Sequence, residues 1–254
     1  MPPRARGARR LLRWIAAPLG IIALLTATDP VSEQRVAAAA DEVVLVGDSL
    51  AQETSPYLER QLGSTPLVEQ YWGGTAPCDW LGKDFQATAA SVVVISFTGN
   101  SLTPCMEDED GTYLHGEALI DKYWADVGAL VVAIRSTGAR VVLVGQPQRG
   151  PAATAGTEAA IEVEGINAMY AALAQADGVS FVDAGAAVET PDGDFATTLP
   201  CLPGEVECGI LGDNVVRNDD GVHLCYGTKP DPCAEYSSGA YRFAAAIASA
   251  LDVR

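Results

Sequence analysis

The sequence predicts an α/β fold, a three-layer sandwich in which a parallel sheet of about five strands lies between two layers of helices. Short apolar runs bounded by Gly, Pro or Asp alternate along the chain with longer stretches that have helical apolar spacing. The chain has 254 residues, of which 48% are hydrophobic, so it can bury one substantial core. Nothing in its length requires a second folded domain.

The apolar runs mark the expected strands. In chain order they are Val43–Val46, Leu67–Tyr71, Val92–Ile95, Val141–Val144 and Val179–Val182, of which the second is the weakest. Most of them lack alternating polar residues, which is typical of parallel strands buried on both faces.

Helix-like stretches separate these strands and follow the last one. They cover Gln52–Leu62, Leu114–Thr137, Glu158–Ala176 and Ser237–Leu251. The segment Glu189–Pro232 is less regular and is rich in Gly, Pro and Asp. It is longer than an ordinary connection, so we expect a functional loop or an excursion held by disulfides.

The N-terminal residues 1–40 have the layout of an export signal or an N-terminal anchor followed by a short linker, which leaves 41–254 as the folded domain. Several arginines precede an apolar run from Trp14 to Ala27. This run is shorter than the roughly 20 residues that a membrane-spanning helix needs, so secretion is favoured over a permanent anchor. We expect a secreted or cell-surface protein that meets the membrane only through this segment, if it is uncleaved.

The charge of the chain limits its partners. The formal net charge of −17 disfavours nucleic acid as a partner, because phosphate binding needs a basic surface. A strongly acidic surface suits a soluble protein outside the cell.

The cysteines indicate disulfides. All six (Cys78, Cys105, Cys201, Cys208, Cys225 and Cys233) lie beyond the N-terminal segment, and an even number in an exported chain is typical of disulfide pairing. Cys201 with Cys208, and Cys225 with Cys233, are spaced as small loop staples, which leaves a long-range bridge between the first two. The sequence alone permits many other pairings. Tight metal-ligand spacing is missing, so we expect no metal site.

Ser49 follows the first expected strand in the stretch VVLVGDSL. Ligands of open α/β sheets bind beyond the carboxyl ends of the strands, and a hydroxyl at the start of a helix lies near backbone N–H groups that stabilise negative charge. Asp48 and Ser49 could instead simply cap the helix. A serine nucleophile also needs a base to accept its proton.

The chain offers two histidines as that base. His115 lies in the polar stretch EDEDGTYLHGEA, which indicates a surface residue, whereas His223 lies in RNDDGVHLC. Asp220, three residues before His223, can reach its ring because Gly221 permits a tight turn; Asp219 is the competitor. A carboxylate on one imidazole nitrogen leaves the other nitrogen to accept the serine proton.

An oxyanion hole is the third requirement of such a site. The candidate donors are the backbone N–H of Ser49, a glycine in YWGGTAPC, and Asn100, just past the strand in VVVISFTGNSL. Asn100 and the glycines could also be ordinary turn residues.

These blocks together resemble the SGNH, or GDSL-type, hydrolase superfamily. The shared features, in order and spacing, are GDSL with Ser49, the glycine loop, TGN with Asn100, and DGVH with Asp220 and His223, and they span roughly Val43 to the C-terminus. The resemblance implies a flavodoxin-like sandwich that hydrolyses esters by a Ser-His-Asp mechanism. The loop GGTAPCDW further resembles SGNH domains that accompany membrane acyltransferases in actinobacteria and modify cell-surface glycans.

Two blocks depart from the family pattern. The third reads T-G-N-S where the family usually has G-x-N-D, so only Asn100 is carried over. The second holds Gly73 and Gly74 side by side, and either could be the donor. We choose Gly74 because the following Thr75 matches the usual Gly-Ser/Thr context.

The expected function is that of an exported serine esterase that hydrolyses carboxylic O-acyl esters through an acyl-enzyme on Ser49, without a metal or organic cofactor. The expected substrates are small O-acyl groups on carbohydrate, or short-chain esters of small molecules. One alternative is an O-acyltransferase that uses the same residues on cell-surface glycans. Another is a non-catalytic glycan-binding module, against which the intact Ser49, Asp220 and His223 argue.

Overall fold

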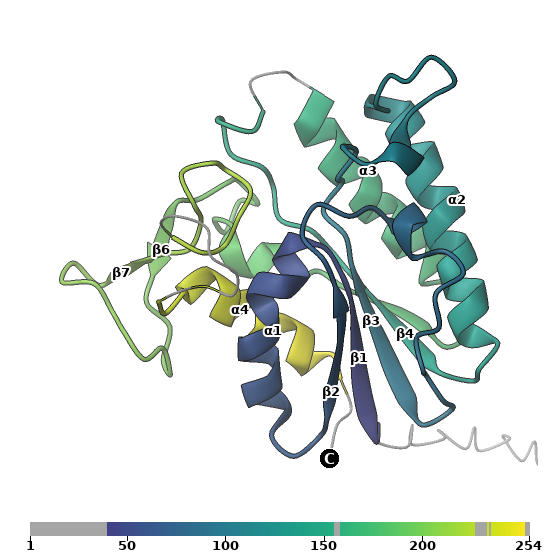
Figure 1. Cartoon of the computed structure of the whole chain (residues 1–254). Coiled ribbons are helices and arrows are strands. Elements are labelled where there is room, and N and C mark those ends of the chain that lie inside the picture. Colours follow the sequence, from purple (N-terminus) through teal and green to yellow (C-terminus); the bar gives the residue numbers. More distant parts are fainter. Residues whose placement is uncertain (1–39, 155–157, 227–232, 234, 252–254) are drawn as a thin grey trace, which may run out of the picture. The chain divides into compact units, whose positions relative to one another are not determined.

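The computed structural model describes residues 40–154, 158–226, 233 and 235–251 (Figure 1). Its centre is a sheet of five parallel strands in the order β2-β1-β3-β4-β5. The strands are β1 (Glu42–Gly47), β2 (Leu67–Tyr71), β3 (Ser91–Ser96), β4 (Arg140–Val144) and β5 (Val179–Val182). All five lie where the sequence predicts them, so the α/β class is confirmed.

Helices cover both faces of this sheet (Figure 1). The four are α1 (Ser49–Leu62), α2 (Gly116–Arg135), α3 (Glu158–Leu173) and α4 (Ser238–Ser249), with α1 and α4 on one face and α2 and α3 on the other. Strand β1 shows why both faces are apolar. Val43 and Leu45 pack into the core beneath α1 and α4, whereas Val44 and Val46 pack into the opposite core. The three-layer sandwich and its flavodoxin-like strand order are therefore confirmed.

The predicted export segment, residues 1–40, lies outside the described residues except for its last member. Ala40 is buried in the core that α1 and α4 cover, so it packs as part of the folded domain. Within the described part of the chain, no helix combines the length and the apolar content needed to cross a membrane.

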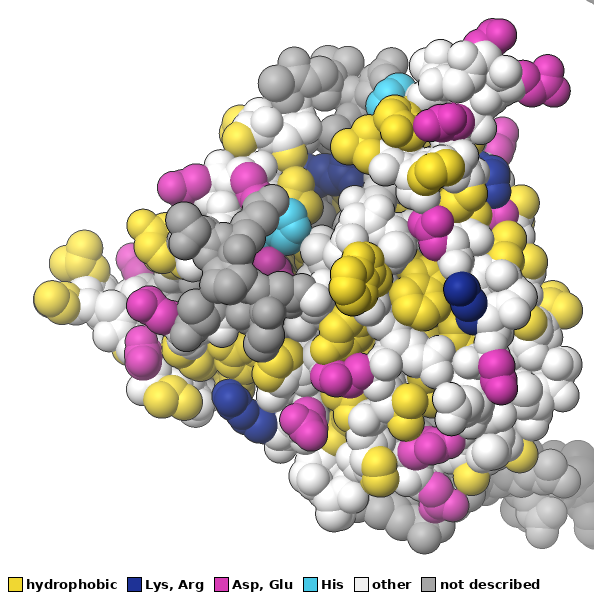
Figure 2. Space-filling view, viewed as in Figure 1, with side chains coloured by type: hydrophobic (Ala, Val, Ile, Leu, Met, Phe, Trp, Pro, Cys, Tyr) yellow, Lys and Arg dark blue, Asp and Glu magenta, His cyan; other side chains and the backbone are white. Residues whose placement is uncertain are grey.

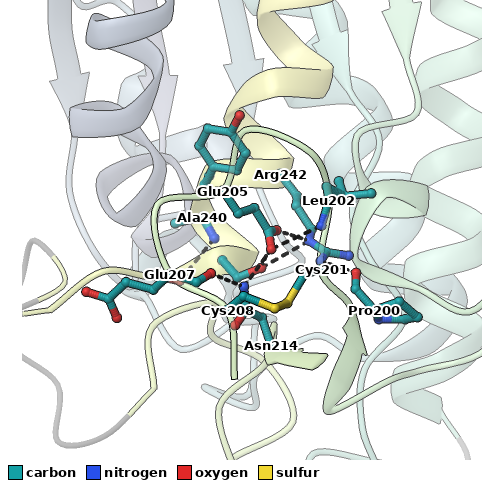
Figure 3. A network of polar contacts seen from close by, with 12 residues as sticks. Pro200, Cys201, Leu202, Glu205, Glu207, Cys208, Asn214, Ala240 and Arg242 are labelled. Carbon is teal, nitrogen blue, oxygen red and sulfur yellow. Dashed lines mark hydrogen bonds and ion pairs between the residues drawn. A yellow bond between two sulfur atoms is a disulfide. The ribbon is translucent and has the colours of Figure 1, made fainter. Parts of the chain in front are cut away.

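The segment predicted to be irregular contains a short antiparallel pair, β6 (Thr198–Pro200) and β7 (Asp213–Val215). Figure 3 shows how the loop between these strands is tied to α4: the Arg242 guanidinium donates to the Glu205 carboxylate at 2.6 Å and to the Pro200 carbonyl at 2.6 Å. Burial alone would raise the pKa of Glu205, but the hydrogen bonds from Arg242, Ser238 and Asn214 lower it below its usual value. The loop is therefore held by a buried ion pair.

Three disulfides join the cysteines that their spacing pairs. They are Cys78–Cys105, Cys201–Cys208 and Cys225–Cys233. The first links the loop after β2 to the loop after β3, so it fastens two neighbouring loops at the carboxyl end of the sheet.

Candidate active site

Ser49 is the first residue of α1 and follows the carboxyl end of β1 after a sharp turn. Gly47 permits this turn, because a Cβ at that position would lie 2.2 Å from the Ser96 carbonyl oxygen. Asp48 caps the helix by accepting the Leu50 N–H at 3.2 Å. Of the two residues that could cap the helix, Asp48 is the one that does so. The Ser49 hydroxyl can therefore make a different contact.

The Ser49 hydroxyl lies at one end of a chain of three side chains. Ser49 Oγ is 3.1 Å from His223 Nε2, and His223 Nδ1 is 2.8 Å from Asp220 Oδ2. An ionised Asp220 accepts the Nδ1 proton, which leaves Nε2 as the lone-pair nitrogen that faces the serine. Asp220 is the residue whose carboxylate contacts the ring, whereas Asp219 is exposed.

The charge on Asp220 is stabilised where it lies. Burial alone would raise its pKa, but hydrogen bonds from the backbone N–H groups of His223 and Val222, and from the His223 ring, lower the pKa well below its usual range. The carboxylate is therefore ionised at neutral pH, as the orientation of the imidazole requires.

Contacts with Gly150 and Arg217 fix the turn that carries Asp220 and His223. Gly221 has φ +75° and lies so close to Gly150 that a Cβ on it would be 2.9 Å from the Gly150 Cα. The buried Arg217 guanidinium donates to the carbonyl oxygens of Gly221 at 3.0 Å and Val222 at 2.9 Å. Burial lowers the pKa of Arg217 to about 10, so its positive charge persists at neutral pH.

Asn100 lies at the carboxyl end of β3, beside the turn after β1. Its side-chain amide donates to Asp48 Oδ2 at 2.8 Å and to the Thr75 carbonyl oxygen at 3.2 Å. Both amide hydrogens therefore already have acceptors. Donation to an oxyanion would require Asn100 to give up one of these bonds, of which the bond to Thr75 is the longer.

Asp48 is buried among several donors. Its Oδ2 accepts the Thr98 N–H at 2.6 Å and the Thr98 hydroxyl at 2.8 Å, in addition to the Asn100 amide. Burial raises the pKa of Asp48 to about 6, although the hydrogen bonds from Thr98 and Leu50 and the charge of Arg149 oppose the rise. Asp48 thus joins the loops after β1 and β3, in addition to its role as a helix cap.

The glycine loop meets Ser49 through Gly73. A Cβ at Gly73 would lie 3.7 Å from the Ser49 Cβ, whereas a Cβ at Gly74 would have no neighbour within 4 Å. The Gly73 N–H donates to Gln52 Oε1 at 3.0 Å. The sequence left both glycines open and favoured Gly74; of the two, Gly73 is the one whose Cβ position faces Ser49.

His115 lies across a recess from His223. The recess has a volume of about 470 Å³, and its lining includes Asn100, Arg149 and both histidines. Figure 2 shows the two histidine side chains, in cyan, on one face of the molecule with a hollow between them. His115 is half exposed and 4.0 Å from Glu162, as expected of a surface residue.

Glu53 is a functional candidate that the sequence analysis missed. Its buried carboxylate accepts the backbone N–H groups of Leu224 at 2.7 Å and Cys225 at 3.3 Å, directly after His223. The available signal was its position four residues after Ser49, on the same face of α1.

One group of three potential metal ligands occurs in the part of the chain that the structure describes. The ligand atoms of Cys78, Asp79 and Cys105 lie within 4.8 Å of one another, but the two sulfurs form a disulfide. A disulfide offers no thiolate to a cation. This group therefore does not suit a metal ion.

The fold and this arrangement define the class of the protein, which has the SGNH, or GDSL-type, hydrolase fold. A GDSL-like lipase from Bacteroides thetaiotaomicron is similar with a TM-score of 0.53 and 16% identity over 83% of this chain and 87% of that one. The acetyl xylan esterase AlAXEase is similar with a TM-score of 0.53 and 17% identity over 82% and 98% of the two chains. A protein from Slackia heliotrinireducens assigned to the SGNH hydrolases is similar with a TM-score of 0.51 and 16% identity over 83% of this chain and 98% of that one.

Within this class, the chain belongs to the family described as "Protein of unknown function (DUF459)", whose match covers residues 42–227. None of the curated proteins matches the sequence. At these low identities the similar structures define the fold alone, because proteins that share a fold carry out many different reactions.

Proposed function

We propose that this protein is an exported serine esterase that hydrolyses O-acyl esters, with Ser49 as nucleophile, His223 as general base and acid, and Asp220 as the residue that orients His223. The single observation that carries the proposal is the hydrogen-bonded chain from Asp220 through His223 to Ser49, with separations of 2.8 Å and 3.1 Å. Serine is a weak nucleophile unless a positioned base accepts its proton, and this chain supplies that base.

The reaction begins when the Ser49 oxygen attacks the ester carbonyl and its proton passes to His223 Nε2. The carbon–oxygen bond to the alcohol then breaks, and the protonated His223 returns the proton to the leaving alkoxide. A water molecule, deprotonated by His223, attacks the acyl-serine ester and releases the carboxylic acid and the free serine. Each proton that leaves a nucleophile thus returns to a leaving group through the same nitrogen.

The oxyanion of each tetrahedral intermediate needs donors close to Ser49. We assign the backbone N–H of Ser49, the backbone N–H of Gly73 and the side-chain amide of Asn100 to this role. Gly73 replaces Gly74 in the assignment because it is the glycine that lies against Ser49. Gly73 and Asn100 both donate to protein acceptors without substrate, so they would exchange these partners for the oxyanion.

The proposed substrates are small O-acyl groups on carbohydrate, or short-chain esters of small molecules. The acetyl xylan esterase among the similar structures supports the carbohydrate choice. The three disulfides support an oxidising compartment and hence export. Transfer of the acyl group to a glycan hydroxyl would use the same residues, with a sugar in place of water at the acyl-enzyme.

Covalent labelling with a fluorophosphonate tests the proposal. The native protein should be labelled on Ser49, and Ser49→Ala should lose both the label and several orders of magnitude of ester turnover while it keeps its melting temperature. Equal labelling of the variant would overturn the assignment. An acetyl-ester panel with and without sugar acceptors then separates the reactions, because hydrolysis gives free acetate and transfer gives an acetylated acceptor. Labelling without turnover, or glycan binding without labelling, would count against the esterase.

A further inference from the structure

A second recess lies beside the active site, at the edge of the sheet formed by β2. Its volume is about 460 Å³. Its lining residues are Gln70, Tyr71, Trp72, Thr75, Asp79, Trp80, Lys83 and Asp84. Three of these eight residues are aromatic, although aromatic residues make up only 7% of the chain. This concentration sets the recess apart from an ordinary piece of acidic surface.

Trp72 is the most unusual member of this lining. It directly follows β2, and 68% of its surface is exposed to solvent. Its backbone is fixed, because its N–H donates to the Gly47 carbonyl at 3.2 Å and its own carbonyl accepts the Thr75 hydroxyl at 2.8 Å. The Trp72 backbone is thus already ordered, and a ligand that stacks on the indole has to order only its two side-chain torsions.

Trp80, another aromatic residue of the lining, is also held in place by the protein. The Trp80 indole N–H donates to the Thr75 hydroxyl at 3.0 Å, and the Trp80 ring packs against the core between the sheet and α2. Cys78, two residues earlier, is bonded to Cys105. The second aromatic wall is therefore rigid in the absence of a ligand, as preformed binding sites usually are.

The position of the recess relates it to the nucleophile. Trp72 is followed by Gly73, which lies against Ser49, and the Thr75 carbonyl accepts the Asn100 amide. The recess is at the β2 side of Ser49, whereas the recess between the two histidines opens toward the loops after β3 and β4. A substrate whose ester lies at Ser49 can thus extend one of its parts over Trp72.

The chemistry of the lining residues determines which part of a substrate can bind in the recess. A flat exposed indole packs against an apolar face of a ligand. The amide of Gln70, the ammonium of Lys83 and the carboxylate of Asp84 can form hydrogen bonds with hydroxyl groups around the edge of that ligand. A pyranose ring has this combination, with C–H bonds on its faces and hydroxyls on its rim. A lipid chain lacks the rim and would bring hydrocarbon against charged groups.

We propose that Trp72 and the recess beside it form a glycan subsite, in which a neutral pyranose ring stacks on the Trp72 indole and presents its O-acyl group to Ser49. This inference rests on the proposed esterase and names the alcohol part of its substrate. Binding itself requires no turnover, so it can be tested separately from catalysis.

The binding test uses the Ser49→Ala protein, so that esters persist during titration. The probes are O-acetylated xylo-oligosaccharides and O-acetylated chito-oligosaccharides, followed by calorimetry. We expect one or both to bind, and the additional change Trp72→Ala to weaken binding by about tenfold or more, as loss of a central tryptophan anchor commonly does. Trp72→Phe, which keeps an aromatic face, should restore part of the loss. Trp124→Ala is the matched control, because Trp124 is also exposed but lies on α2.

The kinetic test compares two substrates in the protein with Ser49 intact. Trp72→Ala should lower kcat/KM for the acetylated oligosaccharide about tenfold more than for 4-nitrophenyl acetate, mainly through KM. Equal losses on both substrates would mean that Trp72 only supports its loop, and would overturn the subsite. Failure of both oligosaccharides to bind, or binding that Trp72→Ala leaves unchanged, would also overturn it. Absence of turnover on every ester, with Trp72-dependent glycan binding retained, would instead count against the esterase and leave the subsite standing.

Discussion

Glu53 Oε2 accepts the backbone N–H of Leu224 at 2.7 Å, and this bond joins the helix that begins with Ser49 to the segment that carries His223. The same oxygen accepts the Cys225 N–H at 3.3 Å, and the Glu53 side chain is buried. Glu53 does not touch the Ser49 hydroxyl or the imidazole through these bonds. Its effect on the reaction would come from fixing the separation between Ser49 and His223.

Glu53→Ala should therefore lower kcat with little change in KM. The loss of the carboxylate leaves two buried N–H groups without this acceptor, which costs about 1–3 kcal/mol for such a group, and a displacement of about 1 Å at His223 can cost about a hundredfold in rate. Steady-state kinetics and urea unfolding measure the two effects.

Glu53→Gln is the matched control for this prediction. Glutamine keeps a carbonyl oxygen that can accept both N–H groups, so most of the activity should return with it. If Glu53→Ala lost stability but kept kcat, the residue would support the fold without positioning His223.

Asp220→Asn should be far more damaging than Asp219→Asn. The Asp220 carboxylate is 2.8 Å from the His223 ring, whereas Asp219 is exposed. An asparagine at 220 keeps the size but loses the charge that selects the tautomer, and comparable losses in serine triads reach about 10⁴ in kcat. Both variants are measured on one activated acetyl ester, with circular dichroism as the check on folding. A larger loss for Asp219→Asn would contradict the assignment.

Asn100→Ala should lower kcat more than it raises KM. Removal of one oxyanion donor typically costs about 10²–10³ in kcat, because the donor acts on charge that develops only in the transition state. Asn100 also donates to buried Asp48, so the melting temperature must be measured beside the kinetics. An increase in KM alone would identify Asn100 as a substrate contact or a turn residue.

The layers of the fold could be predicted because their signal is local. The apolar runs in β1 and β3 are buried on both faces, and such runs stand out in any window of the sequence. The pair β6 and β7 was not predicted, because strands of three residues are too short to show a period. Their loop is stabilised by Glu205 and Arg242, which are 37 residues apart, and no local pattern reveals such a pair.

In the candidate site, too, contacts between residues close in sequence could be predicted, whereas contacts between distant residues could not. Asp220 and His223 lie within one turn, so their spacing alone suggested their contact. The bond from Glu53 to Leu224 spans 171 residues, and the position of Gly73 against Ser49 depends on the path of the whole loop after β2. Only three-dimensional structure brings such residues together.

Removal of the disulfide between Cys78 and Cys105 should affect both stability and rate. The double variant Cys78→Ser/Cys105→Ser should lose about 2–4 kcal/mol of unfolding free energy, the usual range for a native disulfide. It should also lower kcat, because the disulfide fastens the loops that contain Gly73 and Asn100. Urea unfolding and ester kinetics measure these effects.

The matched control is Cys201→Ser/Cys208→Ser. These cysteines are only 7 residues apart, compared with 27 for the first pair, and they lie in the loop next to β6. A shorter closed loop restricts the unfolded chain less, so the loss of stability should be smaller and kcat should be retained. Equal falls in kcat for the two double variants would argue against a specific role of the first disulfide.

The last prediction concerns acid stability. The pKa of Asp220 is lowered on folding, so its carboxylate contributes stability that is fully present above its unfolded value, near 3.9, and is lost as the pH falls toward the folded value. Asp48 works in the opposite sense, because its pKa is raised to about 6 and its contribution therefore declines as the pH rises from about 4 to 6. When the unfolding free energies of the native protein and Asp220→Asn are compared, the contributions of Asp48 and of every other carboxylate that the two proteins share cancel. The native protein should exceed the variant in unfolding free energy at pH 7, and this difference should shrink below about pH 4. Urea unfolding at low protein concentration between pH 7 and pH 3 measures it, and a difference that stayed constant over this range would show that Asp220 holds the turn without its charge.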